Sequence, residues 1–183
     1  MDTKKLRQKI LDLAIRGKLV PQDPNDEPAS VLLERIRAEK EQLIKEGKIK
    51  RSKKSAATDK SHYENVPFEI PESWVWTSIG ELFEHNTGKA LNASNRDGKM
   101  MDYITTSNLY WDRFDLSVVK QMLFTEEELW RCTAKKGDLL ICEGGDIGRA
   151  AIWNYDYDIR IQNHIHRLRG YKGINHRFYY FVF

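Results

Sequence analysis

The chain has 183 residues, of which 40% are hydrophobic and 31% charged, and its formal net charge is +3. This length fits one domain of ordinary size plus an appendage, and no apolar run approaches the about 20 residues of a membrane-spanning helix. The N-terminus lacks the apolar core of a signal peptide and the 2 cysteines form no CxxC motif, so we expect a cytoplasmic protein with free thiols.

Two amphipathic helices are predicted at the N-terminus. The first runs over about residues 3–16, with Thr3 as its N-cap and Gly17 as its stop, and the second begins at Pro28 and ends before Gly47. Apolar residues at helical spacing line one side of each helix: Leu6, Ile10 and Leu13 on the first, and Leu33, Ile36 and Leu43 on the second.

The composition divides the chain into three parts. We interpret residues 1–47 as a helical hairpin that serves as a docking or coiled-coil arm; a helical cap packed on its own domain is the alternative. Residues 48–65 are basic and poor in apolar residues, which predicts a flexible linker that can touch phosphates or be merely solvated. Residues 66–183 form the main domain. Because residues 61–183 carry a net charge of −3, nucleic-acid binding would need positive charge gathered on one face.

The main domain is predicted to be mixed and β-rich with short helices, so that the whole chain belongs to the α+β class. Strands are predicted over 103–109 and 118–124, and helical turns over 77–85, 125–130 and 175–183. Thr125 and Glu128 fit a capping box. The aromatic C-terminal run has no C-cap, which we interpret as a shortened chain or a half-length protein that needs a partner.

The segment 136–153 is predicted to be a β-hairpin. Its apolar runs, Leu139–Cys142 and Ala150–Trp153, flank residues 143–148, which contain three glycines. Glycine permits positive φ and lets backbone N–H groups approach a partner. We interpret this loop as a partner-binding loop on a rigid sheet; an ordinary β-turn is the alternative.

Residues 159–169 alternate apolar and polar side chains, which predicts a half-buried strand with a bulge or an end at Arg167. From Ile159 to Phe183 there are five basic residues and no acidic one. This distribution predicts a basic face.

Catalytic motifs are absent from the sequence. There is no P-loop, no GxSxG and no dinucleotide-binding fingerprint. Glu143 and Asp146 could pair as acid and base, but no nucleophile or activated base is tied to them. His164, His166 and His176 could ligate a metal, but no further ligand lies at motif distance. A metal-dependent enzyme is therefore kept only as an alternative.

Several motifs together carry a family resemblance. They are Pro71-Glu72-Ser73-Trp74-Val75-Trp76, Thr87-Gly88, Tyr103-Ile104, Ser107-Asn108-Leu109, Lys136-Gly137-Asp138-Leu139-Leu140-Ile141 with Gly148, the run 162–169, and Phe178-Tyr179-Tyr180-Phe181. In this order they resemble the specificity (S) subunit, HsdS, of type I restriction–modification systems. The helical segments 6–19 and 28–36 are similar to those of the family. Ser73 departs from the family's usual glycine, and this chain has room for one target-recognition domain and one helical region, where the full subunit has two of each.

The resemblance implies a non-catalytic subunit that recognises a specific DNA sequence. In the family, each target-recognition domain reads half of a bipartite double-stranded DNA site, and the helical regions space the halves and dock methyltransferase (M) subunits. Restriction (R) subunits join for cleavage. S-adenosylmethionine, ATP and Mg are accordingly expected on partner subunits, with no cofactor on this chain and no membrane contact. A homodimer through the helical arm is left open. Alternatives are the recognition domain of another restriction–modification type and a purely structural coiled-coil partner.

Candidate DNA contacts come from side-chain chemistry, because recognition domains vary with their target. Residues whose amides or hydroxyls can read base edges are Asn92, Asn95, Ser107, Asn108, Gln162 and Asn163. Residues whose charge can hold phosphates are Lys89, Arg96, Lys99, Arg149, Arg160, Arg167 and Arg169. A solvated surface side chain is the alternative for each. On this assignment, alanine at Arg167 is predicted to weaken DNA binding without unfolding the domain.

Overall fold

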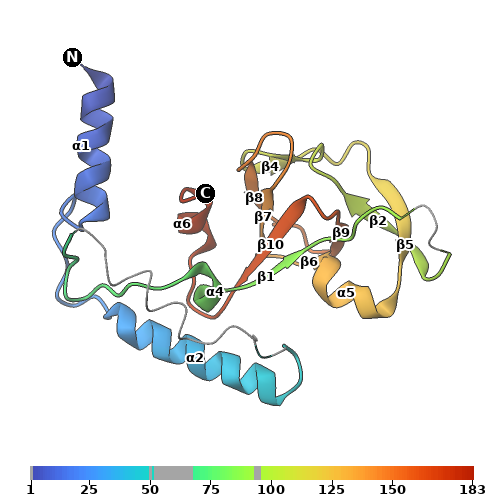
Figure 1. The fold of residues 1–183 in the computed structure, drawn as a ribbon, viewed down its shortest axis with the longest axis horizontal. Coiled ribbons are helices and arrows are strands. Elements are labelled where there is room, and N and C mark those ends of the chain that lie inside the picture. The colour runs from blue at the N-terminus through green and yellow to red at the C-terminus, as the bar shows by residue number, and fades with distance from the viewer. Residues whose placement is uncertain (1, 50, 52–67, 93–95) are drawn as a thin grey trace. The chain divides into compact units, whose positions relative to one another are not determined.

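The computed structural model describes residues 2–49, 51, 68–92 and 96–183 (Figure 1). Their contacts group into two compact units, Met1–Leu82 and Phe83–Phe183. The predicted limits of arm, linker and main domain stay predictions, because most of the linker lies outside the described residues. No helix in the described part is long and apolar enough to cross a membrane.

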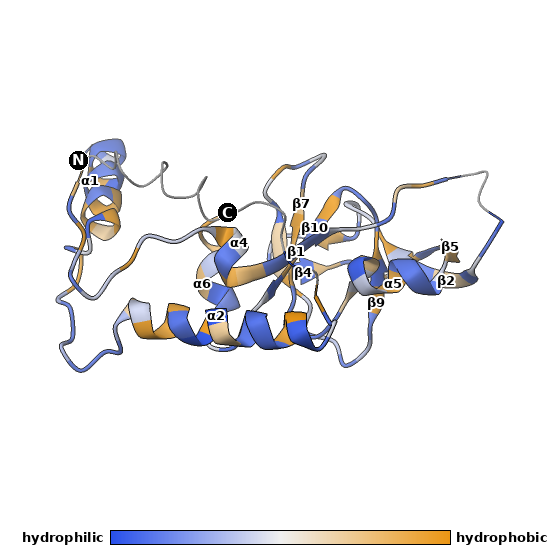
Figure 2. Cartoon of the chain, turned by 60° about the horizontal axis from the view of Figure 1, so that its bottom comes forward, coloured by the Kyte–Doolittle hydropathy of each residue, from blue (hydrophilic) through white to orange (hydrophobic). Residues whose placement is uncertain are grey.

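In its described residues, the N-terminal unit contains the two predicted amphipathic helices and one further short helix. They are α1 (Thr3–Ile15), α2 (Ala29–Lys45) and α4 (Ile79–Leu82). Hydrophobic residues recur along α2 (Figure 2), which packs against α4. Of the six residues predicted for partner docking, Leu33 and Ile36 are buried, Leu13 and Leu43 half-buried, and Leu6 and Ile10 exposed. A coiled-coil pairing of α1 with α2 stays a prediction.

The C-terminal ends of α1 and α2 agree with the prediction better than their N-terminal ends do. Asp2, and not Thr3, is the N-cap of α1, and its carboxylate accepts two backbone N–H groups of the first turn at 3.1 and 3.2 Å. Pro28 caps α2 instead of being its first helical residue. Both helices end, as predicted, before a glycine in the left-handed region, Gly17 with φ +65° and Gly47 with φ +70°.

The strands of the C-terminal unit form two larger sheets and a small hairpin. They are β1 (Phe83–Thr87), β2 (Lys99–Ile104), β3 (Leu109–Tyr110), β4 (Arg113–Phe114), β5 (Lys120–Phe124), β6 (Thr133–Ala134), β7 (Leu139–Cys142), β8 (Ala150–Ile152), β9 (Ile159–Ile161) and β10 (Ile165–Gly170). One sheet has the order β1-β10-β7-β8 and is antiparallel throughout. The other has the order β5-β2-β9-β6, with β2 and β9 parallel. The fold is therefore mixed α+β.

Two short helices are described in this unit besides the strands: α5 (Glu126–Cys132) and α6 (His176–Tyr180), which lie on different sides of the strands (Figure 1). The predicted capping box is present: the Thr125 hydroxyl and the Glu128 carboxylate each accept the other residue's backbone N–H. The predicted C-terminal helix is also present, with Asn175 as its N-cap.

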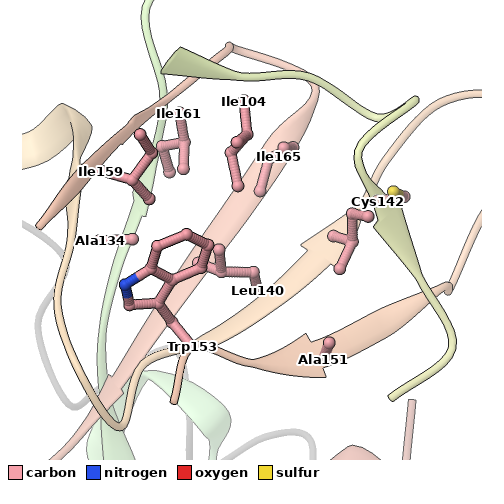
Figure 3. Close-up of a cluster of buried hydrophobic side chains, with 10 residues drawn as sticks. Ile104, Ala134, Leu140, Cys142, Ala151, Trp153, Ile159, Ile161 and Ile165 are labelled. Atoms are coloured by element: carbon pink, nitrogen blue, oxygen red, sulfur yellow. The ribbon is translucent and has the colours of Figure 1, made fainter. Parts of the chain in front are cut away.

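Side chains from both sheets meet in one core around Trp153 (Figure 3). Leu140 comes from the first sheet and Ile161 from the second, and all three side chains are fully buried. The indole N–H of Trp153 donates to the backbone carbonyl of Tyr157 at 2.8 Å, so its polar atom is satisfied inside the core. This shared core fixes the ends of the two sheets relative to each other.

The predicted hairpin over 136–153 is confirmed, with Leu140 opposite Ala151. The predicted single strand over 159–169 is wrong. Instead β9 lies in one sheet and β10 in the other, and the Ile165 N–H donates to the Gln162 carbonyl at 2.9 Å to close a turn between them. Alternation of apolar and polar residues does not reveal such a change of sheet, because both strands bury their isoleucines in the same core.

Candidate nucleic-acid interface

Four loops meet at one end of the two sheets. We define the loop surface as residues 88–92, 105–108, 143–149 and 162–164. The Lys89 N–H donates to the Ile161 carbonyl and the Asn163 N–H donates to the Lys89 carbonyl, both at 3.0 Å. The Gln162 N–H donates to the Ile104 carbonyl, also at 3.0 Å. These bonds tie the first, second and fourth loops together through the ends of β2 and β9.

The 143–149 loop joins the same cluster from the other sheet. The Glu143 N–H donates to the His164 carbonyl at 3.0 Å. The Arg149 guanidinium donates from Nη2 to the Thr106 carbonyl at 3.0 Å and lies over the Tyr110 ring, 5.1 Å from its centroid. The loop is thus exposed at its tip, as predicted, and bonded at both of its ends; its binding role stays a prediction.

A ladder of titratable side chains supports the base of this loop. The rings of His85 on β1 and His166 on β10 are stacked, and His85 Nε2 lies 2.7 Å from His166 Nδ1. His166 Nε2 lies 3.3 Å from the Glu143 carboxylate. Burial, followed by the nearby charges of His166 and Arg167, lowers the pKa of His85. Sequence reasoning missed this ladder, because His85 and His166 become neighbours only when β1 pairs with β10.

We predict that the C-terminal unit loses stability as the pH falls from about 7.5 to about 5.5. Burial lowers the pKa of His176, whose Nε2 accepts the Gly170 N–H at 2.9 Å. The unfolded chain therefore binds this proton more readily than the folded one, so stability is complete above the ordinary histidine pKa of 6.5 and falls below it. His85 acts in the same direction, whereas the lowered pKa of Glu128 acts only at more acidic pH.

Thermal unfolding followed by circular dichroism at several pH values measures this loss. His176→Gln keeps an acceptor at the position of Nε2 but does not titrate, so its melting temperature should depend less on pH than that of the wild type. A wild-type melting temperature that stays constant over this range contradicts the prediction.

The predicted contact residues differ widely in exposure. Asn92, Arg96, Lys99 and Ser107 are exposed; Arg149, Arg160, Gln162, Asn163 and Arg169 are half-buried; Lys89, Asn108 and Arg167 are buried; and Asn95 lies outside the described residues. Ser107, Gln162, Asn163 and Arg149 belong to the loop surface together with Asn92. Lys99 instead begins β2, at the end of that strand away from residues 105–108.

Three of the predicted contacts are corrected by their burial. Lys89 is 6% exposed and forms an ion pair with Glu128 at 2.5 Å. The Asn108 side chain accepts the Thr105 N–H at 2.9 Å and donates to two backbone carbonyls, so it holds its own loop. Arg167 is fully buried. None of the three can present its polar group to a phosphate or a base.

The three arginines within residues 159–169 do not form the basic face that was predicted over 159–183. Arg160 lies on β9 and donates to the Asp158 carbonyl at 3.0 Å. Arg169 lies on β10, in the other sheet, and donates to both Asp138 carboxylate oxygens at 2.8 and 2.7 Å. With Arg167 buried, the three cations are committed to contacts inside the domain.

The three histidines considered for a metal do not converge. His166 belongs to the ladder with His85 and Glu143, whereas His176 accepts the Gly170 N–H. Among the residues that the structure describes, no three His, Cys, Asp or Glu side chains gather in an arrangement that could hold a metal ion. Both cysteines have free thiols, as predicted, and the structure places both in the interior.

The comparisons of the sequence with family models and with curated proteins point to one family. The family model described as "Type I restriction modification DNA specificity domain" matches residues 71–183. The specificity subunits of the type I restriction enzymes EcoAI and EcoEI from Escherichia coli are each 57% identical to the chain, over 83 residues (45% of this chain, 14% of the relative) and 79 residues (43% and 13%). The crystal structure of the HsdS subunit from Thermoanaerobacter tengcongensis has a TM-score of 0.48 and 16% identity, covering 84% of this chain and 38% of that chain. The chain thus matches about one seventh of the two curated relatives.

Proposed function

Because the chain belongs to the family of type I restriction modification DNA specificity domains, we propose that it recognises a specific double-stranded DNA sequence through the loop surface. The observation that carries this proposal is the convergence of four hydrogen-bonded loops from two sheets that share one core. Loops that a rigid scaffold holds in place can contact bases with little loss of conformational entropy on binding.

The hydroxyl and amide groups of the loop surface that are exposed or half-buried suit base edges better than phosphates. Ser107 is exposed and Gln162 and Asn163 are half-buried, and hydroxyl and amide groups of this kind read bases in the major groove. Arg96 and Lys99, which are exposed, would supply phosphate contacts outside this surface. This separation of base contacts from phosphate contacts fits a domain whose arginines on β9 and β10 form hydrogen bonds within the domain.

We further propose that the chain is non-catalytic and delivers partner subunits to half of a bipartite site in the cytoplasm. M subunits with S-adenosylmethionine and R subunits with ATP and Mg would then carry the chemistry. The apolar side chains that α1 leaves exposed, Leu6, Ile10, Leu11 and Ile15, support a docking role for this helix, either with an M subunit or with a second copy of the chain.

The experiment is selection of bound duplexes from a randomised DNA library, using the full chain assembled with its M subunits, followed by sequencing. We expect one enriched motif, and binding to that motif should weaken steeply as salt rises from about 50 to about 200 mM. A non-specific DNA-binding protein would show the salt dependence without a motif. Failure of the assembled complex to enrich any motif contradicts the proposed function.

A further inference from the structure

We propose that Asp146 and Ile147, at the tip of the 143–149 loop, read neighbouring bases in the major groove: Asp146 the N4 amino group of a cytosine, and Ile147 the methyl group of a thymine. This inference rests on the proposed function and deepens it, because it assigns a base chemistry to two side chains. Sequence reasoning had weighed Asp146 only as an acid–base group.

The two side chains are presented at the outermost part of the loop. Ile147 is 78% exposed. The Asp146 side chain is 77% exposed, and its Oδ2 lies 3.9 Å from Nε of Arg149, so this long ion pair leaves most of the carboxylate accessible. Single exposed apolar residues are common on protein surfaces. Here, however, Ile147 lies between Asp146 and Gly148 on a loop that is hydrogen-bonded at both ends. The fold therefore determines the position of its side chain.

The loop is organised before any partner binds. The Gly148 N–H donates to the Cys142 carbonyl at 3.1 Å, and the Arg149 N–H donates to the Asp146 carbonyl at 3.3 Å. Gly145 and Gly148 adopt φ of +74° and +87°, which a residue with a side chain rarely does. Arg149 then attaches the loop to residues 105–108. A tip held in this way can bind DNA without a large cost for ordering it.

The chemistry of the tip selects the part of DNA that it can contact. A carboxylate is repelled by phosphates, and its favourable partner on a base edge is an amino donor, as offered by cytosine N4. An apolar side chain finds its counterpart in the thymine C5 methyl group. Both groups lie in the major groove, and neighbouring base pairs are separated by about 3.4 Å, within reach of adjacent residues. Asp146 and Ile147 therefore fit a pair of adjacent positions in the target.

The test repeats the randomised-library selection with the full chain and its M subunits, comparing wild type with Asp146→Asn and Ile147→Ala. Ile147→Ala should lose the preference for thymine at one position and bind the wild-type motif about tenfold more weakly. Asp146→Asn should change an adjacent position from cytosine to adenine, because asparagine pairs with adenine N6 and N7. All other positions of the motif should be unchanged in both variants.

Two exposed residues outside the loop surface provide matched controls. Asp156→Asn removes the charge of a carboxylate that is 87% exposed, and Val75→Ala shortens an apolar side chain that is 42% exposed. Both should retain the wild-type motif. If Asp146→Asn and Ile147→Ala also retain every position and the wild-type affinity, the inference is overturned while the proposed function stands. If the wild-type complex enriches no motif, the proposed function itself fails.

Discussion

Replacing Arg167 with alanine is expected to destabilise the C-terminal unit by about 3–5 kcal/mol, which is the typical cost of breaking a buried ion pair. Its guanidinium donates from Nη1 to the carbonyls of Thr133 at 2.7 Å and Trp130 at 3.0 Å, and from Nη2 to the Glu84 carboxylate at 2.7 Å. One side chain on β10 therefore joins β1, α5 and β6. Alanine would leave an empty volume, a Glu84 carboxylate without its cation and a Trp130 carbonyl without this donor.

Urea unfolding of the purified chain measures this loss, with Lys99→Ala as the control. Lys99 was assigned the same phosphate-binding role from the sequence, but it is exposed and its removal should leave the unfolding midpoint nearly unchanged. A double-mutant cycle with Glu84→Gln separates the ion pair from the other contacts. If Arg167→Ala unfolds at the wild-type urea concentration and only its DNA binding is weaker, the structural role is refuted and the assignment made from the sequence is restored.

The features predicted correctly from the sequence are those whose causes are local. The stops at Gly17 and Gly47 depend on one residue each, and the capping box at Thr125 depends on a residue three positions away. The hairpin over 136–153 needs only two apolar runs and a glycine-rich turn between them. In each of these cases the interacting groups are close in the chain, so spacing alone determines the contact.

The incorrect assignments share a different cause. Arg167 meets Glu84, which lies 83 residues away in the chain, and Lys89 meets Glu128, which lies 39 residues away. A buried cation and a phosphate-binding cation have the same side chain, and they differ only in whether the fold brings a carboxylate to them. The order of the strands in the sheets determines whether a carboxylate lies beside the cation. Strand order depends on contacts between residues far apart in the chain, and the periodicity of the sequence does not predict it.

The loop surface includes both features that could be predicted from the sequence and features that could not. Its polar residues and glycines were identified from composition, and the exposure of the 143–149 loop was predicted. The convergence of the four loops was not, because it depends on β9 and β10 crossing from one sheet to the other within three residues. Candidate residues could therefore be named from the sequence, but their grouping into one surface required the fold.

Replacing Gly88 with alanine is expected to disturb this grouping directly, at a cost of about 3 kcal/mol. A Cβ at this position would lie 2.0 Å from the Ile161 carbonyl oxygen and 2.4 Å from that of Gln162. Both atoms belong to the backbone, so no side-chain rotation relieves the contact and β9 must move away. Gly144→Ala is the matched control on the same surface, since its Cβ would find the nearest atom, of His164, at 3.8 Å.

Thermal unfolding and the randomised-library selection together distinguish the consequences of the two changes. Gly88→Ala should melt at a lower temperature and lose base preference at several positions, because the shift displaces residues 88–92 together with residues 162–164. Gly144→Ala should melt like the wild type. The prediction fails if the two alanine variants melt at the same temperature. In that case the backbone at Gly88 and the backbone of residues 161–162 could move apart without loss of stability. A narrow defect at one or two positions, as expected for Ile147→Ala, would instead mean that the loops read DNA independently of one another.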